Sequence, residues 1–300
     1  MQRRYNPGNV VTAMVTPFNK EGDIDFNQVE KLANHLADNG SDAILVAGTT
    51  GESPTLTHDE ELELLAAVKS AVGTKAQIIM GAGSNCTRTA VKMSKKVEKA
   101  GADALLSVVP YYNKPSQDGM VAHFSAIAES TNLPIMLYNI PGRTGVNMEP
   151  ETIAKVARKY ENIFAVKQSN ANLDLVTEII QAAPEDFVLY SGDDSLTLPM
   201  MSLGAVGVVS VASHIIGNEI QAMIKAFNSG NVKEAIALQH KYYPVFKKIF
   251  MAPNPVPVKA ALAKIGIINE DVRLPLVQLT KAQKEEFFAT VDYVLQGVAL

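Results

Sequence analysis

Eight short apolar runs recur along the chain at fairly regular intervals, and this recurrence restricts the possible folds more than any other feature. The runs lie near residues 10–15, 43–47, 77–81, 104–109, 135–138, 163–167, 187–191 and 206–211. They have the length and β-rich composition of strands, and the stretches between them have helical periodicity. Eight strand–helix units in succession predict a parallel (β/α)8 barrel, the TIM barrel fold. A doubly wound open sheet has the same alternation, and periodicity alone does not separate the two architectures.

Residues typical of helix ends flank three of the helical stretches. Thr57 and Glu60 have the spacing of a capping box at a helix N-terminus. Gly40 and Gly101 each follow an apolar helical stripe, where glycine commonly ends a helix. These signals support one helix in each interval between the first four strands.

The alternation stops near residue 228, where residues 228–231 read Asn-Ser-Gly-Asn, a turn sequence. Helical patterns follow at about residues 231–251, 256–265 and 281–296, with no further strand of comparable strength. We therefore predict a barrel domain of residues 1–230 that carries the active site and a small C-terminal helical domain of residues 231–300.

Composition and charge exclude several classes of protein. The 300-residue chain has a net charge of −4, so it lacks the basic character of a nucleic-acid-binding protein. Its single cysteine, Cys86, excludes an intrachain disulfide and a cysteine-rich metal site. No apolar run reaches the ~18 residues that span a bilayer, and the five histidines show no metal-binding spacing. We expect a cytoplasmic protein with no metal, no membrane contact and no nucleic-acid partner.

Lys167 is the first candidate for a catalytic residue. It ends the run Ile-Phe-Ala-Val-Lys at residues 163–167, which has the character of a buried strand. Burial disfavours a charged ammonium, and an uncharged lysine amine is a nucleophile suited to Schiff-base chemistry on a carbonyl substrate. The alternative is a strand-end lysine whose amine extends into solvent.

Polar residues also follow the fifth and second strands. Residues 138–144 read Tyr-Asn-Ile-Pro-Gly-Arg-Thr, in which Tyr138 can serve as a general acid or base and Arg143 can bind a carboxylate. Residues 48–53 read Gly-Thr-Thr-Gly-Glu-Ser, whose hydroxyls and backbone N–H groups can hold a carboxylate. A capped loop with a solvated arginine, and a plain strand-to-helix turn, are the alternatives.

The segments that directly follow the fourth and seventh predicted strands allow more than one interpretation. Tyr111 and Tyr112 can relay protons or can lie at an interface. Asp193 and Asp194 are adjacent, so their side chains diverge in a turn; this favours helix N-capping over magnesium binding.

These residues together resemble the dihydrodipicolinate synthase and N-acetylneuraminate lyase superfamily of class I aldolases, over essentially the whole chain. The resemblance rests on five motifs, at residues 16–17, 48–52, 138–144, 254–259 and 273–275. It is greatest to the dihydrodipicolinate synthase branch. The sugar-acid lyases usually have Ser-Thr in the glycine loop and lack the arginine of the tyrosine motif.

The resemblance implies a reaction and a set of catalytic residues. Lys167 forms an imine with pyruvate, and the derived enamine attacks L-aspartate 4-semialdehyde to give 4-hydroxy-tetrahydrodipicolinate in lysine and diaminopimelate biosynthesis. No cofactor is implied, because the substrate itself is bound covalently. Tyr138 is the implied general acid/base. Thr49 links it by hydrogen bonds to Tyr112, which reaches in from a neighbouring subunit.

The resemblance also implies binding residues and an assembly. Thr50 holds the pyruvate carboxylate, Arg143 binds the semialdehyde carboxylate, and Gly192 and Val209 lie near the lysine as backbone contacts. The implied assembly is a homotetramer built as a dimer of dimers. The alternatives are a pyruvate-dependent sugar-acid aldolase, which Arg143 disfavours, and a catalytically silent paralogue, which the altered residues after Lys167 keep open.

Two departures from the family pattern affect these expectations. Residues 168–170 read Gln-Ser-Asn where the family usually has a glutamate first, so the field near the imine and the substrate preference are expected to differ. Some family members bind lysine through a histidine and a glutamate at a subunit interface. Glu61 and Thr89 stand at those positions here, although His58, Asn85 and Tyr111 match. We therefore predict weak or absent inhibition by lysine.

Overall fold

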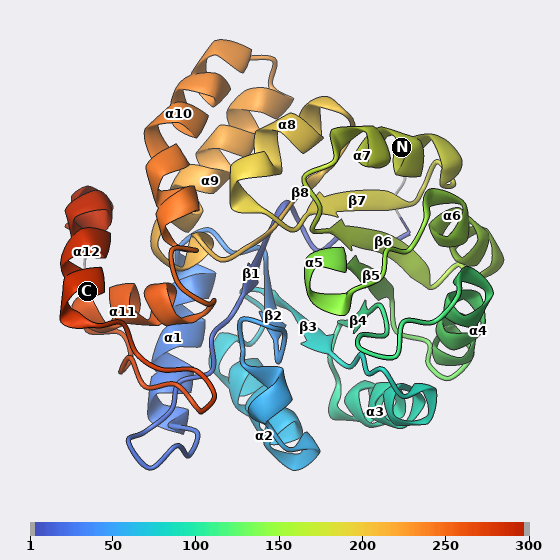
Figure 1. Cartoon of the computed structure of the whole chain (residues 1–300), viewed down its shortest axis with the longest axis horizontal. Coiled ribbons are helices and arrows are strands. Elements are labelled where there is room, and N and C mark those ends of the chain that lie inside the picture. The colour runs from blue at the N-terminus through green and yellow to red at the C-terminus, as the bar shows by residue number, and fades with distance from the viewer. Residues whose placement is uncertain (1–3, 297–300) are drawn as a thin grey trace. The chain divides into compact units, whose positions relative to one another are not determined.

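Eight parallel strands, hydrogen-bonded in chain order, form a closed barrel in the computed structural model, which describes residues 4–296 (Figure 1). The strands are β1 (Val10–Ala13), β2 (Ala43–Val46), β3 (Gln77–Gly81), β4 (Ala104–Val108), β5 (Ile135–Asn139), β6 (Ile163–Gln168), β7 (Val188–Ser191) and β8 (Gly207–Ser210). Each coincides with a predicted run, so the TIM barrel is confirmed and the open sheet is excluded. Every residue of β1, β2, β5, β6 and β8 is buried, as expected for parallel strands covered on both faces.

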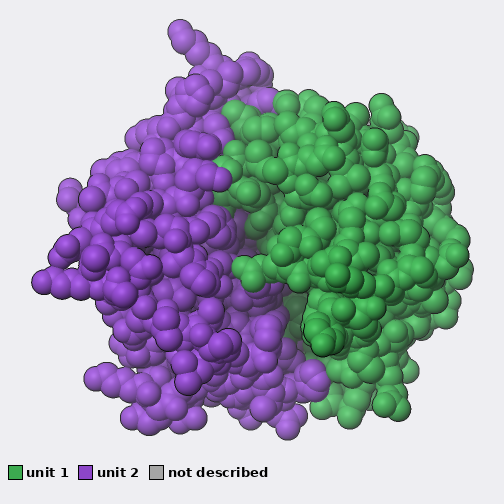
Figure 2. All heavy atoms as spheres, in the orientation of Figure 1, with its two compact units in different colours: residues 1–8, 78–209 green, residues 9–77, 210–300 purple. Residues whose placement is uncertain are grey.

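The chain divides into two compact units (Figure 2). The first unit comprises residues 1–8 and 78–209, and the second comprises residues 9–77 and 210–300. These units group residues by spatial contact. The division into a barrel domain of residues 1–230 and a helical domain of residues 231–300 stays a prediction.

In the first unit, strand register places the candidate lysine between two tyrosines. Lys167 of β6 lies opposite Tyr138 of β5 on one side and opposite Tyr190 of β7 on the other. The helices of this unit are α3 (Thr87–Ala100), α4 (Gln117–Ala128), α5 (Pro141–Thr144), α6 (Pro150–Lys159), α7 (Leu173–Ala182) and α8 (Thr197–Ser202), with the 3-10 helix η2 (Asp194–Leu196). Gly101 ends α3 in the left-handed conformation at φ 82°, as predicted.

The second unit contains the C-terminal helices. Its elements are α1 (Phe26–Asp38), the 3-10 helix η1 (Ser53–Thr55), α2 (His58–Val72), α9 (Ser213–Asn228), α10 (Val232–Lys248), α11 (Val256–Lys264) and α12 (Lys281–Leu295). The three predicted C-terminal helices correspond to α10, α11 and α12. Within residues 4–296, no helix combines the length and the apolar character that a membrane crossing requires.

Two helix ends of the second unit test the predicted caps. The capping box is confirmed: the Glu60 N–H donates to Thr57 Oγ1 at 3.2 Å, and the Thr57 N–H donates to Glu60 Oε2 at 2.7 Å. The C-cap of α1 is Asn39, one residue before the predicted Gly40. Gly40 follows at φ 89°, and a Cβ there would come within 2.5 Å of the backbone of Gly217. Glycine is therefore required by both the backbone angle and the space.

Candidate active site

Lys167 and Tyr138 are the centre of the candidate site in the first unit. Both side chains are buried, with 6% of Lys167 and 4% of Tyr138 exposed. Lys167 Nζ lies over the Tyr138 ring, 4.3 Å from its centroid. Within residues 4–296, this nitrogen has no hydrogen bond and no ion pair. The lysine is therefore buried, contrary to the solvent-exposed alternative, and its amine is not occupied by a carboxylate.

Gly192 leaves space beside this lysine. Its N–H donates to the carbonyl oxygen of Gln168 at 2.8 Å, which holds the end of β7 against the end of β6. A Cβ on Gly192 would lie 3.1 Å from Lys167 Cε and 1.8 Å from Ser169 Oγ. Only glycine fits this position without movement of its neighbours. Val209 is buried on β8, next to Val208, which pairs with Ser191 of β7.

The amide of Gln168 contacts the segment that follows β5. Its Oε1 accepts a hydrogen bond from Asn139 Nδ2 at 3.1 Å, and Asn139 Oδ1 accepts one from the Met148 N–H at 3.1 Å. Successive strand residues point to opposite faces, so Gln168 and Lys167 point in opposite directions. The expected effect of this glutamine on the field near the imine is therefore indirect. Gln168 contacts Asn139 directly, and Asn139 in turn contacts Met148, in the segment after β5 that also carries Arg143.

Arg143 lies on the short helix α5 and is exposed. Within the described part of the chain, its guanidinium has no hydrogen bond and no ion pair. An unpaired guanidinium can bind a carboxylate through two parallel hydrogen bonds. The arginine is thus available for an anionic ligand, and no contact fixes its side chain beforehand.

Tyr112 points into solvent in this single chain. It is 89% exposed, and its backbone has the left-handed φ of 72°, which costs a non-glycine residue roughly 1–2 kcal/mol. Two amides hold the loop: Asn85 Nδ2 donates to the Tyr111 carbonyl at 3.2 Å, and Asn113 Nδ2 donates to the Asn85 carbonyl at 2.9 Å. An aromatic side chain held outward in a strained conformation is typical of a binding surface.

In the second unit, the loop of residues 48–51 lies between two non-glycine residues with positive φ, Ala47 at 51° and Glu52 at 55°. Thr49 is half-buried and Thr50 is buried. The Thr50 hydroxyl oxygen accepts a hydrogen bond from Asn254 Nδ2 at 2.9 Å. Because Asn254 donates to this oxygen, the Thr50 hydroxyl proton remains available for a ligand carboxylate.

Glu52, at the end of this loop, is paired with a second buried lysine. Lys259 Nζ donates to Glu52 Oε1 at 2.6 Å and to the Asp271 carbonyl at 2.7 Å, and neither charged side chain is more than 2% exposed. Burial lowers the pKa of Lys259 to about 8, despite the opposing effect of the Glu52 carboxylate. The sequence analysis did not predict this pair. The available signal was a lysine within the apolar start of α11.

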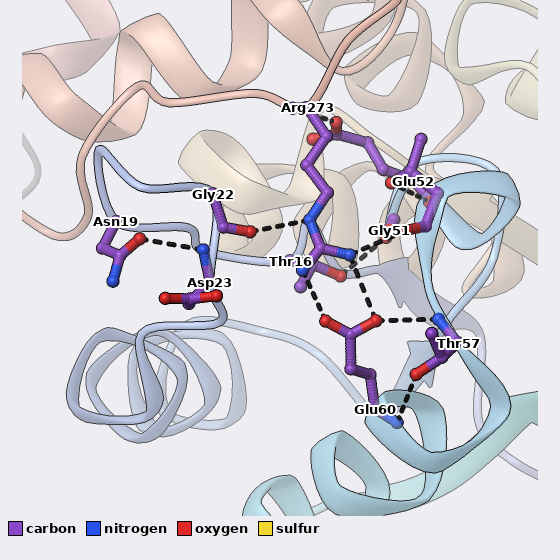
Figure 3. Close-up of polar contacts among 10 residues, drawn as sticks. Thr16, Asn19, Gly22, Asp23, Gly51, Glu52, Thr57, Glu60 and Arg273 are labelled. Atoms are coloured by element: carbon purple, nitrogen blue, oxygen red, sulfur yellow. Dashed lines mark hydrogen bonds and ion pairs between the residues drawn. The ribbon is translucent and has the colours of Figure 1, made fainter.

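Arg273 holds the segment on the other side of Glu52 (Figure 3). Its N–H donates to Glu52 Oε2 at 3.0 Å, its Nε to the Gly22 carbonyl at 2.7 Å and its Nη1 to the Thr55 carbonyl at 2.7 Å. The guanidinium also forms an ion pair with Glu60, and this hydrogen bonding lowers the pKa of the Glu60 carboxyl to about 2.

Asp193 caps the 3-10 helix η2, as predicted. Its Oδ1 accepts hydrogen bonds from the N–H and the hydroxyl of Ser195, each at 2.8 Å. Within residues 4–296, no three His, Cys, Asp or Glu side chains are grouped so that they can hold a metal ion.

The fold and these strand-end side chains define a (β/α)8-barrel protein whose candidate active site contains a buried lysine beside a tyrosine. The chain belongs to the dihydrodipicolinate synthetase family, whose sequence model matches residues 6–294.

Relatives match over nearly the full length of the chain. A 4-hydroxy-tetrahydrodipicolinate synthase 1 of Halalkalibacterium halodurans is 54% identical over 287 residues, which cover 96% of this chain and 97% of that protein. A solved structure of dihydrodipicolinate synthase from Cyanidioschyzon merolae, with lysine bound, has a TM-score of 0.95 and 50% identity and covers 99% of this chain and 100% of that one. A solved structure of a Bacillus anthracis dihydrodipicolinate synthase has a TM-score of 0.92 and 48% identity, and the match covers 98% of this chain and 99% of that one.

Proposed function

We propose that this chain is a Schiff-base lyase that condenses pyruvate with L-aspartate 4-semialdehyde to 4-hydroxy-tetrahydrodipicolinate, in lysine and diaminopimelate biosynthesis. The observation that carries the proposal is the buried Lys167 amine, which has no ion-pair partner within residues 4–296 and lies 4.3 Å from the centre of the Tyr138 ring. The names of the full-length relatives support the same activity.

The reaction begins at the lysine nitrogen. The amine of Lys167 attacks the ketone carbon of pyruvate, water leaves, and an imine forms. Loss of a methyl proton gives an enamine, whose carbon attacks the aldehyde of the semialdehyde. Tyr138 delivers the proton that the new alkoxide requires. The amino group of the second substrate then attacks the imine carbon, which closes the ring and releases Lys167. The substrate is held by a protein side chain throughout, so the scheme needs no external cofactor.

Both substrates are anions, and different residues are assigned to each carboxylate. Thr50 and the backbone of its glycine loop hold the pyruvate carboxylate. Arg143 holds the carboxylate of the semialdehyde through paired hydrogen bonds. Gly192 and Val209 are assigned as backbone contacts of the lysine, and Thr49 and Tyr112 are assigned to proton transfer with Tyr138. These assignments rest on the family motifs and on the exposure and hydrogen bonding of each residue.

Trapping with borohydride tests the proposal directly. The protein is incubated with pyruvate, reduced and weighed by mass spectrometry, and we expect an increase equal to one reduced pyruvate per chain. Product formation from the semialdehyde is then compared with cleavage of N-acetylneuraminate. An unchanged mass would indicate a catalytically silent protein, and preferential cleavage of the sugar acid would indicate a sugar-acid aldolase.

The exposed Tyr112 supports a homo-oligomeric enzyme, which we propose to be a tetramer built as a dimer of dimers. Tyr112 is 89% exposed, and its hydroxyl has no hydrogen bond within residues 4–296. In a symmetric pair of subunits, each chain can supply Tyr112 to the site of the other. The active site is then complete only in the oligomer.

Subunit complementation tests this exchange. Tyr112→Phe and Tyr138→Phe are each expected to have low activity. When the two variants are mixed and allowed to exchange subunits, activity should recover to roughly a quarter of the wild-type value, because about half the pairs are mixed and each mixed pair has one intact site. A mixture no more active than its components would contradict a shared site.

Weak or absent inhibition by lysine remains a prediction. Glu61 is buried and accepts a hydrogen bond from His58 Nδ1 at 2.9 Å, and burial raises the pKa of its carboxyl. Thr89 has no charge with which to bind an effector's amino group. Steady-state inhibition should be measured beside the Cyanidioschyzon merolae relative, whose structure contains lysine. Comparable micromolar inhibition of both proteins would show this prediction to be wrong.

A further inference from the structure

The glycine loop is attached to the C-terminal helical segment by a fully buried ion pair. Glu52 directly follows residues 48–51, and both of its carboxylate oxygens are occupied. Oε1 accepts from Lys259 Nζ at 2.6 Å, and Oε2 accepts from the Arg273 N–H at 3.0 Å. The aromatic ring of Phe18 also lies beside Lys259, with its centroid 4.3 Å from Nζ. A carboxylate bound at both oxygens has little freedom to move.

The loop and the segment that directly follows it are held at three further points. Thr16 Oγ1 donates to the Gly51 carbonyl at 2.6 Å, and Asn254 Nδ2 donates to Thr50 Oγ1 at 2.9 Å. The Thr55 carbonyl accepts from the Arg273 guanidinium at 2.7 Å. Glu52 itself has a left-handed backbone at φ 55°. A non-glycine residue keeps this backbone conformation only where the surrounding contacts determine it.

We propose that Glu52, Lys259 and Arg273 are positioning residues that set the conformation of residues 48–51 and thereby the affinity for the carboxylate of the 2-oxo acid. This inference rests on the proposed function, which assigns Thr50 to that carboxylate. The lysine and the arginine come from the C-terminal segment, so residues far from the chemistry in sequence determine the shape of a substrate-binding loop. None of the three needs to touch the substrate.

The dependence of adduct formation on pyruvate concentration tests the proposal. Borohydride-trapped adduct is measured by mass for the wild type and for the double variant Glu52→Gln/Lys259→Met, which removes both charges together and avoids leaving one buried charge unpaired. We expect the half-saturating pyruvate concentration to rise about 10- to 100-fold, because a small misplacement of a binding group has effects of that size. The maximal yield of adduct should not change.

A matched control lies on the same helix. Lys264 forms an ion pair with Asp292 at 2.6 Å, but both side chains are 40% exposed. Lys264→Met is the same substitution on α11 and should leave the half-saturating concentration unchanged. A purely structural role of the buried pair would lower the fraction of active protein, and hence the maximal yield, without altering the concentration dependence.

The outcomes separate this inference from the proposed function. Absence of adduct in the wild type would reject the function itself. The positioning role would be overturned if the wild type forms the adduct normally and the folded double variant has nearly the same half-saturating pyruvate concentration, within twofold of the wild-type value. If the double variant does not fold, Glu52→Gln alone replaces one of the two accepting oxygens by an NH2 donor, which then faces either Lys259 Nζ or the Arg273 N–H. A several-fold rise is then expected, and an unchanged value would again overturn the proposal.

Discussion

Lys167→Ala is expected to abolish the borohydride-trapped pyruvate adduct and to lower turnover by roughly 10⁴- to 10⁶-fold. The reaction proceeds through a covalent bond to this nitrogen, and alanine provides no substitute. The assay combines protein mass after reduction with the initial rate of semialdehyde consumption. Circular dichroism establishes that the variant is folded, which is expected because removing an unpaired buried amine leaves no partner charge behind.

Two controls make this result specific to Lys167. Lys167→Arg retains a cationic side chain of similar length, but a guanidinium does not act as the nucleophile, so this variant should also fail to form the adduct. Lys259→Met removes a second buried lysine, which has no exposed surface. If it folds, it should still be labelled at saturating pyruvate, because Lys259 Nζ is occupied by Glu52 and by the Asp271 carbonyl. An adduct that persists in Lys167→Ala would contradict the assignment.

Tyr138→Phe is expected to lower turnover by roughly 10²- to 10⁴-fold, the usual contribution of a positioned general acid or base. Phenylalanine keeps the ring that lies 4.3 Å from Lys167 Nζ and removes only the hydroxyl. Packing around the lysine should therefore be preserved. Turnover is measured by steady-state kinetics, and the formation of the pyruvate imine is measured separately by trapping.

Tyr190→Phe is the matched control, because Tyr190 lies opposite Lys167 on the other neighbouring strand. Its hydroxyl donates to the Gly8 carbonyl at 2.6 Å. Loss of that bond should cost about 1 kcal/mol in the free energy of unfolding and leave turnover within a few-fold of wild type. Equal losses of activity in both variants would indicate that either substitution disturbs the lysine through packing alone.

The barrel could be predicted because each strand corresponds to a pattern of residues within a short stretch of the sequence. Runs such as residues 163–167 are short, apolar and rich in β-forming residues, and the intervals between them have helical periodicity. The capping box at Thr57 and Glu60 was predictable for the same reason, since both partners lie within one turn. The C-cap of α1 differed from the prediction by one residue, because hydrogen bonding decides where a helix ends.

The direction of individual side chains was less accessible from the sequence. Gln168 was noted as a departure next to the lysine, but the alternation along β6 directs its amide to Asn139. Tyr112 was recognised as a candidate on a loop, but the sequence does not signal its left-handed backbone at φ 72°. Motif spacing identifies residue types, whereas the path of the backbone decides what they touch.

The two buried lysines show what the sequence alone determined and what required the tertiary structure. The apolar run that ends at Lys167 predicted a buried strand, and the apolar residues around Lys259 carry a similar local signal that the prediction did not use. Local sequence does not tell whether a buried amine has a counter-charge. Lys259 meets Glu52 across 207 positions of the chain, whereas Lys167 meets the face of an aromatic ring on the neighbouring strand. Pairing of this kind depends on which distant segments the fold brings together, and it leaves one amine occupied and the other available for covalent chemistry.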